Sequence, residues 1–323
     1  MHSVASVFGK PERSLDKWRI WKTQTAWHHS GKTRPQEDPV DIAHLQTWIG
    51  RSEEVAERVG PFASNALGAT LDRDEPPYTD GGELPLLWHW LHFHTPCPQG
   101  QLGPDGHPAR GGFIPPIPLP RRMWAGSRLT SLAPMRIGRQ LRRVSTIKDV
   151  AHKSGRSGEL VFVTVRHRIL DGDTPCVEEE QDIVYREAPA AGAPVPTPKS
   201  APEGSAFSRA IDPDPVLLQR YSALTFNGHR IHYDRDFCKQ DEGYPGLVVH
   251  GPLLATLLLD LLRRQYPGAR IADFSFRAVA PVFDINDFSV HGAPDKAERT
   301  FRLWVRRHDG ALAMTAIATL AEG

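Results

Sequence analysis

Cysteine is scarce in this chain, and its spacing excludes the usual cysteine-built sites. Cys97, Cys176 and Cys238 are odd in number and widely separated, and they form neither a CxxC pair nor a Cys/His cluster with zinc spacing. This pattern predicts three free thiols in a reducing compartment. We therefore expect no disulfide, no metal ion and a cytoplasmic location.

Long apolar runs and an excess of one charge are also absent. The most apolar segment, residues 253–262, is interrupted by Asp260 and followed by Arg263 and Arg264, so it is too short to span a bilayer. The formal net charge of +1 gives no global field that favours nucleic acid or an anionic membrane. We expect no nucleic-acid partner and no membrane partner.

The 323 residues are enough for two domains of ordinary size. Residues 1–37 lack the apolar core of a secretion signal and are predicted to form an N-terminal extension. Two domains are predicted at residues 38–186 and 205–323. Residues 187–204, EAPAAGAPVPTPKSAPEG, have the composition of an extended linker between them.

Helical patterns precede strand patterns in the N-terminal half. Helices are predicted at 41–49, with Asp41 as N-cap, and at 53–59 and 63–71. An aromatic strand at 86–93 and a long Gly/Pro-rich loop at 96–120 follow, and a loop of that length is often functional. Alternating apolar residues then predict an antiparallel meander with strands at 142–150, 159–170 and 177–185.

The C-terminal half repeats this order of elements. A helix is predicted from Asp214 and a strongly apolar helix at 252–264, and strands are predicted at 270–280, 300–307 and 312–321. Helices that precede an antiparallel meander, twice over, favour an α+β fold over a parallel α/β fold. The sequence therefore predicts a duplicated α+β architecture.

Polar residues gather between the two helices of the C-terminal half. The segment 221–234 reads YSALTFNGHRIHYD, and His250-Gly251-Pro252 opens the apolar helix downstream. Unpaired N–H groups at a helix start attract a developing oxyanion, and Gly251 and Leu253 are the candidate donors because Pro252 has none. A histidine in a loop is commonly structural, so these residues alone leave a catalytic and a structural role equally open.

Segment 221–234 resembles the hydratase motif of MaoC-type R-specific enoyl-CoA hydratases. The stretches LPLLWHWLHF, GPDGHPARGGFIPPIPLPRRMWAG, GRSGELVFVTVRH, EEEQDIVYRE and GYPGLVVHGPLL are similar to those of bacterial mesaconyl-C4-CoA (itaconyl-CoA) hydratases, relatives of the mitochondrial 3-hydroxyacyl-thioester dehydratases. The resemblance covers roughly residues 40–323. It implies a double hot-dog fold, in which each of two antiparallel sheets wraps around a central helix, and the reversible hydration of an enoyl-CoA thioester.

One position departs from the family motif, in which a catalytic Asp lies five residues before a catalytic His. Here these positions hold Asn227 and His232. An amide cannot accept a proton at neutral pH, so we expect His232 to be the sole general base and Asn227 to hold the water or fix the imidazole. Asp234 is expected to anchor the turn. His229 and His250 are expected either to orient the loop or to transfer protons.

Guanidinium groups are the expected partners of a substrate carboxylate or of CoA phosphates. The candidate substrate-binding residues are Arg230, Arg277, Arg121, Arg122, Trp124, His250 and Leu253. Arg139, Arg142 and Arg143 are expected to form an exposed basic edge. Because only the C-terminal half carries the motif, we expect one active site per chain, with the N-terminal half supplying pocket walls.

The expected partner is an acyl-CoA substrate, with CoA as its carrier and no separate cofactor. The fused halves imply a pseudo-dimer, and such chains can assemble further into a homo-oligomer. Three other functions stay open from the sequence. They are a 3-hydroxyacyl-thioester dehydratase of fatty-acid synthesis, a thioesterase and a non-catalytic thioester-binding protein.

Overall fold

The computed structural model describes residues 39–155, 158–187 and 197–322. The predicted N-terminal extension and residues 188–196 of the predicted linker lie outside this part of the chain. From Pro39 onward the chain forms one compact unit. The predicted domain limits, 38–186 and 205–323, stay a prediction.

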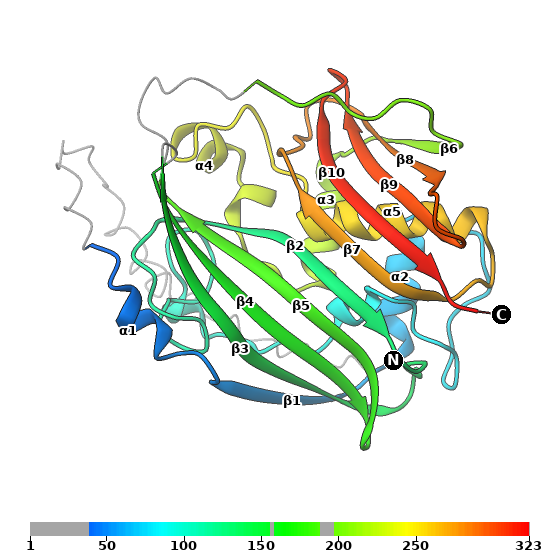
Figure 1. The fold of residues 1–323 in the computed structure, drawn as a ribbon, viewed down its shortest axis with the longest axis horizontal. Coiled ribbons are helices and arrows are strands. Elements are labelled where there is room, and N and C mark those ends of the chain that lie inside the picture. Colours follow the sequence, from blue (N-terminus) through cyan, green and yellow to red (C-terminus); the bar gives the residue numbers. More distant parts are fainter. Residues whose placement is uncertain (1–38, 156–157, 188–196, 323) are drawn as a thin grey trace, which may run out of the picture. The chain divides into compact units, whose positions relative to one another are not determined.

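Among the described residues, ten strands form one antiparallel sheet in the order β1-β3-β4-β5-β2-β7-β10-β9-β8-β6 (Figure 1). The N-terminal half contributes β1 (Ser52–Arg58), β2 (Arg121–Ser131), β3 (Gln140–Gly155), β4 (Gly158–Asp171) and β5 (Thr174–Arg186). The C-terminal half contributes β6 (Phe207–Ile211), β7 (Ile271–Ala278), β8 (Phe288–Pro294), β9 (Thr300–Arg307) and β10 (Leu312–Leu320). The halves join where β2 pairs with β7.

A glycine permits the close approach of these two central strands. Gly126 of β2 lies opposite Arg277 of β7. A Cβ atom at position 126 would lie 2.4 Å from the carbonyl oxygen of Phe276. Any side chain there would push β2 away from β7 and open the sheet between its halves.

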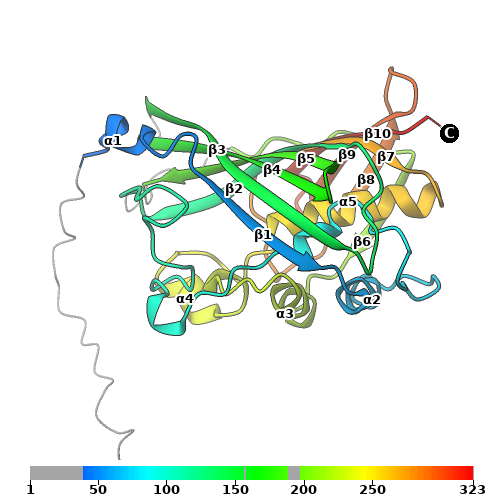
Figure 2. The ribbon, with the colours of Figure 1, turned by 90° about the horizontal axis from the view of Figure 1, so that it is seen from below.

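Five α-helices and three 3-10 helices are described, and α5 is the longest. They are α1 (Ile42–Gln46), α2 (Pro61–Thr70), α3 (Pro215–Leu224), α4 (Arg235–Gln240) and α5 (Gly251–Gln265), with η2 (Trp88–Leu91), η3 (Gln99–Gln101) and η4 (Arg230–His232). Every residue from Leu253 to Leu262 is buried, and α5 packs against β2, β6, β8, β9 and β10. Figure 2 shows α5 next to the sheet, with α2 and α3 farther out on the same side.

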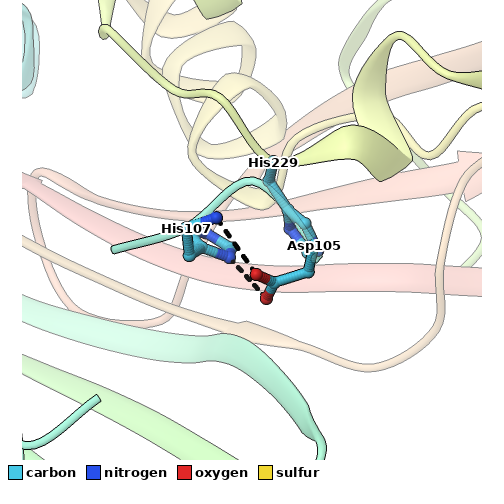
Figure 3. A group of neighbouring side chains, drawn as sticks. All are labelled: Asp105, His107 and His229. Atoms are coloured by element: carbon cyan, nitrogen blue, oxygen red, sulfur yellow. Dashed lines mark hydrogen bonds and ion pairs between the residues drawn. The ribbon is translucent and has the colours of Figure 1, made fainter. Parts of the chain in front are cut away.

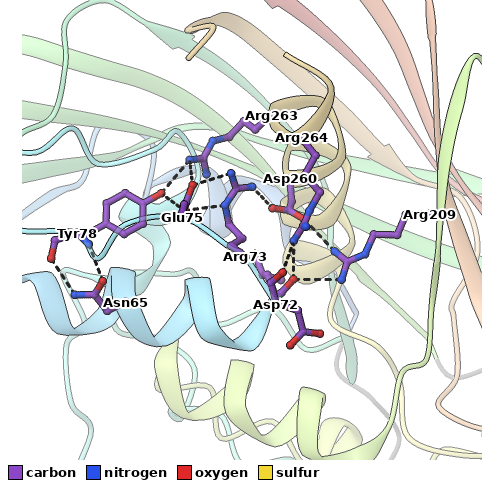
Figure 4. A network of polar contacts seen from close by, with 10 residues as sticks. Asn65, Asp72, Arg73, Glu75, Tyr78, Arg209, Asp260, Arg263 and Arg264 are labelled. Atoms are coloured by element: carbon purple, nitrogen blue, oxygen red, sulfur yellow. Dashed lines mark hydrogen bonds and ion pairs between the residues drawn. The ribbon is translucent and has the colours of Figure 1, made fainter. Parts of the chain in front are cut away.

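Buried charge fixes α5 to the N-terminal half (Figure 4). The carboxylate of Asp260, 1% exposed, forms ion pairs with Arg73 from the segment after α2, with Arg209 from β6 at 3.1 Å and with Arg264 at 2.8 Å. Three guanidinium groups balance one carboxylate that burial would otherwise destabilise. The network therefore connects elements of both halves around the central helix.

Most predicted elements are confirmed. Asp41 caps α1 by accepting a hydrogen bond from the His44 N–H at 3.0 Å, and the three cysteines are unpaired. The predicted helices at 63–71 and 252–264 correspond to α2 and α5, and the six predicted meander strands correspond to β3, β4, β5, β7, β9 and β10. The α+β fold class is confirmed.

Two predicted elements are wrong. The helix predicted at 53–59 is replaced by strand β1, Ser52–Arg58, because the alternating exposure of these residues suits an edge strand paired with β3. Residues 86–93 form a bent segment with η2 instead of a strand, since Leu87 and Phe93 have positive φ angles of 74° and 61° that a strand cannot contain. The sequence analysis missed β2, β6, β8 and α4.

No helix of the described ranges has the length and apolarity that a membrane span requires.

Candidate active site

A cleft of about 1290 Å³ lies between the two halves. The N-terminal half lines it with residues that include His107, Arg122 and Trp124, and the C-terminal half with residues that include Asn227, His232 and Gly251. This volume exceeds the range of about 300–1,000 Å³ that is common for small-molecule sites. The cleft therefore has room for a ligand with an extended carrier group.

His232 lies in this cleft with a defined tautomer. Its Nδ1 lies 2.6 Å from the carbonyl oxygen of Val248. Because a carbonyl oxygen only accepts, Nδ1 carries the proton and Nε2 keeps its lone pair. The ring is 7% exposed, and burial lowers the pKa of His232 to about 4. The imidazole is therefore neutral at physiological pH and can accept a proton at Nε2.

Further imidazoles extend from His232 in both directions. The ring of His250 stacks on it at 3.6 Å between centroids, and Nε2 of His250 hydrogen-bonds with Oγ of Ser222 at 2.8 Å. On the other side, His229 meets His232 edge-on at 5.5 Å, and His107 lies 4.1 Å from His229. Burial lowers the pKa of His107, His229 and His250, so this row of rings is neutral.

Asn227 holds the loop that carries these rings. Its Oδ1 accepts a hydrogen bond from the backbone N–H of His229 at 3.0 Å, and its own N–H donates to the carbonyl of Ser222 at 2.9 Å. The side-chain NH₂ donates to none of the described residues, although Asn227 lines the cleft. The amide therefore fixes the turn with one atom and can offer a donor to a water with the other.

The start of α5 lies at the same cleft. The N–H groups of Gly251 and Leu253 donate to no described acceptor, whereas the Leu254 N–H donates to the carbonyl of His250 at 3.0 Å. Gly251 lines the cleft. Leu253 does not line the cleft, and its side chain is buried in the core. The unpaired N–H of Gly251, at the positive end of a 15-residue helix, can bind an oxyanion.

The Gly/Pro-rich loop of the N-terminal half packs onto the loop that carries Asn227 and His232. A Cβ at Gly106, whose φ is +86°, would lie 2.0 Å from the carbonyl oxygen of Gly228. Arg230 donates from its backbone to the carbonyl of Asp105 at 2.9 Å and from its side chain to that of Pro104 at 3.0 Å. The N-terminal half therefore positions the loop that carries Asn227 and His232, in addition to forming pocket walls.

The candidate arginines separate into three groups. Arg121 and Arg230 line the cleft but form ion pairs with Glu242 at 3.2 Å and Asp234 at 2.7 Å. Arg122 lines the cleft and forms no ion pair among the described residues. The structure does not bring Arg277 to the cleft: its exposed side chain points outward, because residues alternate along β7 and Phe276 faces the core.

Trp124 lines the cleft, and His250 lies next to it. Trp124 packs on Trp90 at 4.7 Å between centroids and donates from Nε1 to Ser127 Oγ at 2.9 Å. His250 is fully buried, and its ring contacts that of His232.

The sequence analysis missed an arginine on the inner face of the sheet. Arg143 was expected on an exposed edge, but it lines the cleft and burial lowers its pKa. Arg143, Ser145 and Ile147 alternate along β3, and Ser145 and Ile147 are fully buried. The spacing of two residues along RRVSTI could have placed Arg143 on the inner face.

An Asp–His pair from the N-terminal loop was also missed. Asp105 Oδ2 accepts from His107 Nδ1 at 3.0 Å, and Oδ1 accepts from the His107 backbone N–H at 3.0 Å (Figure 3). Burial acts to raise the pKa of Asp105, but the hydrogen bonds from His107 outweigh it and hold that pKa below its usual value. Asp105, His107 and His229 each place one oxygen or nitrogen atom within 4.8 Å of the others.

The chain is similar to several known proteins. A family model described as hydroxyacyl-thioester dehydratase type 2 matches residues 87–284. The chain is 49% identical to mesaconyl-C(4)-CoA hydratase of Chloroflexus aurantiacus over 279 residues, 86% of this chain and 98% of that protein. It is 28% identical to the mitochondrial hydroxyacyl-thioester dehydratase type 2 of Schizosaccharomyces pombe, over 61% of this chain and 73% of that protein.

Solved structures share the fold at low sequence identity. A MaoC-like dehydratase from Phytophthora capsici superposes with a TM-score of 0.63 at 14% identity, covering 88% of this chain and 98% of that one. A Mycobacterium tuberculosis protein described as having a double hot-dog fold superposes with a TM-score of 0.52 at 12% identity, covering 84% and 96%. The double hot-dog prediction is confirmed.

Proposed function

Because this chain belongs to the hydroxyacyl-thioester dehydratase type 2 family, we propose that it hydrates a dicarboxylyl-CoA of four or five carbons, with mesaconyl-C4-CoA or itaconyl-CoA as substrate. The chain is an enoyl-CoA hydratase/dehydratase, a carbon–oxygen lyase. The observation that carries the choice of substrate is the identity of 49% with mesaconyl-C(4)-CoA hydratase over nearly all of that protein.

In the proposed reaction His232 is the general base. Its unprotonated Nε2 takes a proton from water while the water oxygen bonds to the β-carbon, and the electron pair of the double bond moves toward the α-carbon and the thioester oxygen. The imidazolium then returns the proton to the α-carbon. A well-placed general base of this kind contributes roughly 10²- to 10⁴-fold to the rate.

The start of α5 supports the other half of the reaction. The thioester oxygen gains negative charge as water adds, and the unpaired N–H of Gly251 can donate to it. The NH₂ group of Asn227 can hold the attacking water on the side of the cleft that carries His232. The fold holds both groups in place before the reaction begins. Electrostatic stabilisation of a transition state is largest when its donors are preorganised in this way.

Arg122 is the proposed anchor for an anionic part of the substrate. It lines the cleft without an ion pair to any described residue, whereas Arg121 and Arg230 are already paired. Trp124 offers an aromatic surface beside it. We further propose that the reaction needs no cofactor, that CoA enters as part of the substrate, and that the chain acts in the cytoplasm, with further assembly into a homo-oligomer.

A 3-hydroxyacyl-thioester dehydratase of fatty-acid synthesis is the second candidate, because the yeast relatives carry that description. The lining of the cleft argues against it. Arg122 lines the cleft without an ion pair to any described residue, and a straight alkyl chain would leave this guanidinium without an anionic partner.

Steady-state assays of the purified chain on a small panel of thioesters test the proposal. The panel holds mesaconyl-C4-CoA, itaconyl-CoA, crotonyl-CoA and a long straight-chain 2-enoyl-CoA. We expect the largest kcat/KM for one of the two dicarboxylyl thioesters. A preference for the long straight chain would replace the proposal with the dehydratase of fatty-acid synthesis.

A further inference from the structure

The Gly/Pro-rich loop at 96–120 places one carboxylate, that of Asp105, beside the row of imidazoles. Asp105 contacts His107 through both of its oxygens, and His107 packs against His229 (Figure 3). The ring of His229 in turn meets that of His232. The loop is held there by the close contact of Gly106 with Gly228 and by the two hydrogen bonds from Arg230. The carboxylate comes from a segment more than 100 residues away from the catalytic loop.

The reaction needs a negative charge at this place. When His232 takes a proton from water, a neutral row of rings becomes positively charged, and the burial of His232 and His250 opposes that charge. Asn227 cannot compensate it, because an amide carries no charge. A neighbouring carboxylate can compensate the positive charge, since the attraction between opposite charges is strong where water is excluded.

Asp234, the carboxylate nearest in sequence to His232, is already committed to structure. Its Oδ1 accepts from the Phe237 N–H at 2.9 Å and caps α4, and its Oδ2 accepts from Arg230 at 2.7 Å. Both oxygens therefore have partners, and a guanidinium balances the charge. Among the described residues, the carboxylate of Asp105 is paired only with His107, a ring of the row itself.

We infer that Asp105, held by His107, supplies to the catalytic imidazoles the negative charge that Asn227 lacks. Asp105 is thus a positioning and charge-balancing residue that acts through His107 and His229. The inference rests on the proposed hydratase function. The step it assists is the one in which an O–H bond of water breaks, the C–O bond forms and the proton moves to Nε2 of His232, from which it later passes to the α-carbon.

The side chains of Asp105, His107 and His229 together have the donor set of a metal site. Their surroundings nevertheless favour a proton over a divalent cation. The guanidinium groups of Arg122 and Arg110 lie near enough to His107 to oppose positive charge there. Both oxygens of Asp105 already accept hydrogen bonds from His107. A bound cation would have to displace the ring hydrogen bond and face these guanidiniums.

The test is Asp105→Asn in the full chain, assayed on the thioester that the wild type hydrates best. The amide keeps the shape and one acceptor oxygen but removes the charge. We expect kcat to fall on the order of 10- to 100-fold with KM unchanged, because the charge acts on the transition state. Asn227→Asp, combined with Asp105→Asn, should restore at least part of the lost kcat, since it returns a carboxylate that can still accept from the His229 N–H.

Glu159→Gln is the matched control, because it removes the carboxylate partner of His152 in the β3–β4 hairpin, and neither residue lines the cleft. It should leave kcat unchanged. His107→Gln is a second variant, for the case that Asp105→Asn unfolds the loop; it should lower kcat in the same way, with an unchanged melting temperature.

Three results would overturn the inference. They are a wild-type kcat in folded Asp105→Asn, no gain in kcat from Asn227→Asp in that background, and a wild-type activity that chelation with EDTA abolishes and zinc restores. Failure of the proposed function is distinct, since the wild-type chain would then hydrate no thioester of the panel.

Discussion

The two halves of the sheet differ in what covers their inner face. In the C-terminal half the 15-residue helix α5 packs against four strands of its own half, and ten consecutive residues of it are buried. In the N-terminal half the corresponding helix, α2, has 10 residues and packs against η2 and α3. A buried helix therefore covers the inner face of the C-terminal half, whereas the strands of the N-terminal half contribute Arg143, His167 and Glu179 to the lining of the cleft.

Two buried carboxylates, one from each half, are held in contrasting ways. Asp260 of α5 is balanced by the guanidiniums of three arginines. Glu179 of β5 instead accepts from Ser127 Oγ at 2.9 Å, from Trp90 Nε1 at 3.0 Å and from His89 Nε2 at 3.1 Å. The first carboxylate connects the two halves, whereas the second belongs to the cleft lining, which suggests separate roles in stability and in binding.

The largest effect is expected at His232, in the half that carries the motif. His232→Gln removes the proton acceptor, so kcat should fall roughly 10²- to 10⁴-fold with little change in binding. Steady-state kinetics and binding of an unreactive acyl-CoA would measure the two effects separately. A variant that keeps wild-type kcat would remove His232 from the reaction and leave the C-terminal half with a purely structural role.

Asp260→Ala should have the next largest effect, on stability. It leaves three guanidinium groups without their shared partner, and loss of one member of a buried ion pair costs about 3–5 kcal/mol. The free energy of unfolding, from urea titration, would measure it. Asp309→Ala is a suitable control, because its pair with Arg307 lies at the surface and such pairs contribute little. Equal losses in the two variants would contradict the structural role of Asp260.

Glu179→Gln should have a smaller effect on stability and a visible effect on the substrate. The amide can no longer accept from all three donors, and an unsatisfied buried donor costs about 1–3 kcal/mol. Because Glu179 lines the cleft, KM should change as well, which is not expected for Asp260→Ala. An unchanged KM would place the acyl group away from this part of the N-terminal half.

The smallest effect concerns pH. Burial lowers the pKa of His232 to about 4, and protonation of Nε2 abolishes its role as base. The value of kcat/KM should therefore stay constant as pH falls from 8 to about 5 and drop to half near pH 4, whereas an exposed imidazole would lose half its activity near pH ~6.5. A pH profile on protein shown to be folded at each pH would measure this. A half-loss near pH 6.5 would contradict the burial of the reactive ring.

The sequence was most informative where a local pattern determines structure. The apolar run after Gly251 required a buried helix, and alternation along β3, β4 and β5 required a meander. The spacing of Asn227 and His232 placed both on one short loop, and the structure puts both in the cleft. In each case the neighbours that matter lie within a few residues along the chain.

Contacts between distant segments could not be read in this way. Nothing in GPDGHPARGG shows that His107 lies beside His229, since that depends on how the loop folds over Gly228. Residues 53–59 contain helix-favouring Glu and Ala, but pairing with β3 outweighs that weak propensity. Arg277 was expected in the cleft and lies outside it, whereas Arg143 was expected on an exposed edge and lines the cleft. The reason is that the direction of a side chain depends on its place in the alternation along the strand.

Incubation of the purified chain with mesaconyl-C4-CoA in ¹⁸O-labelled water tests the account most directly, with products followed by mass spectrometry. The account predicts an intact CoA thioester that is heavier by one labelled water, with the label on carbon, and no such product from His232→Gln. Release of free CoA with label in the acid would identify a thioesterase instead, and an unchanged thioester would contradict hydration of this substrate.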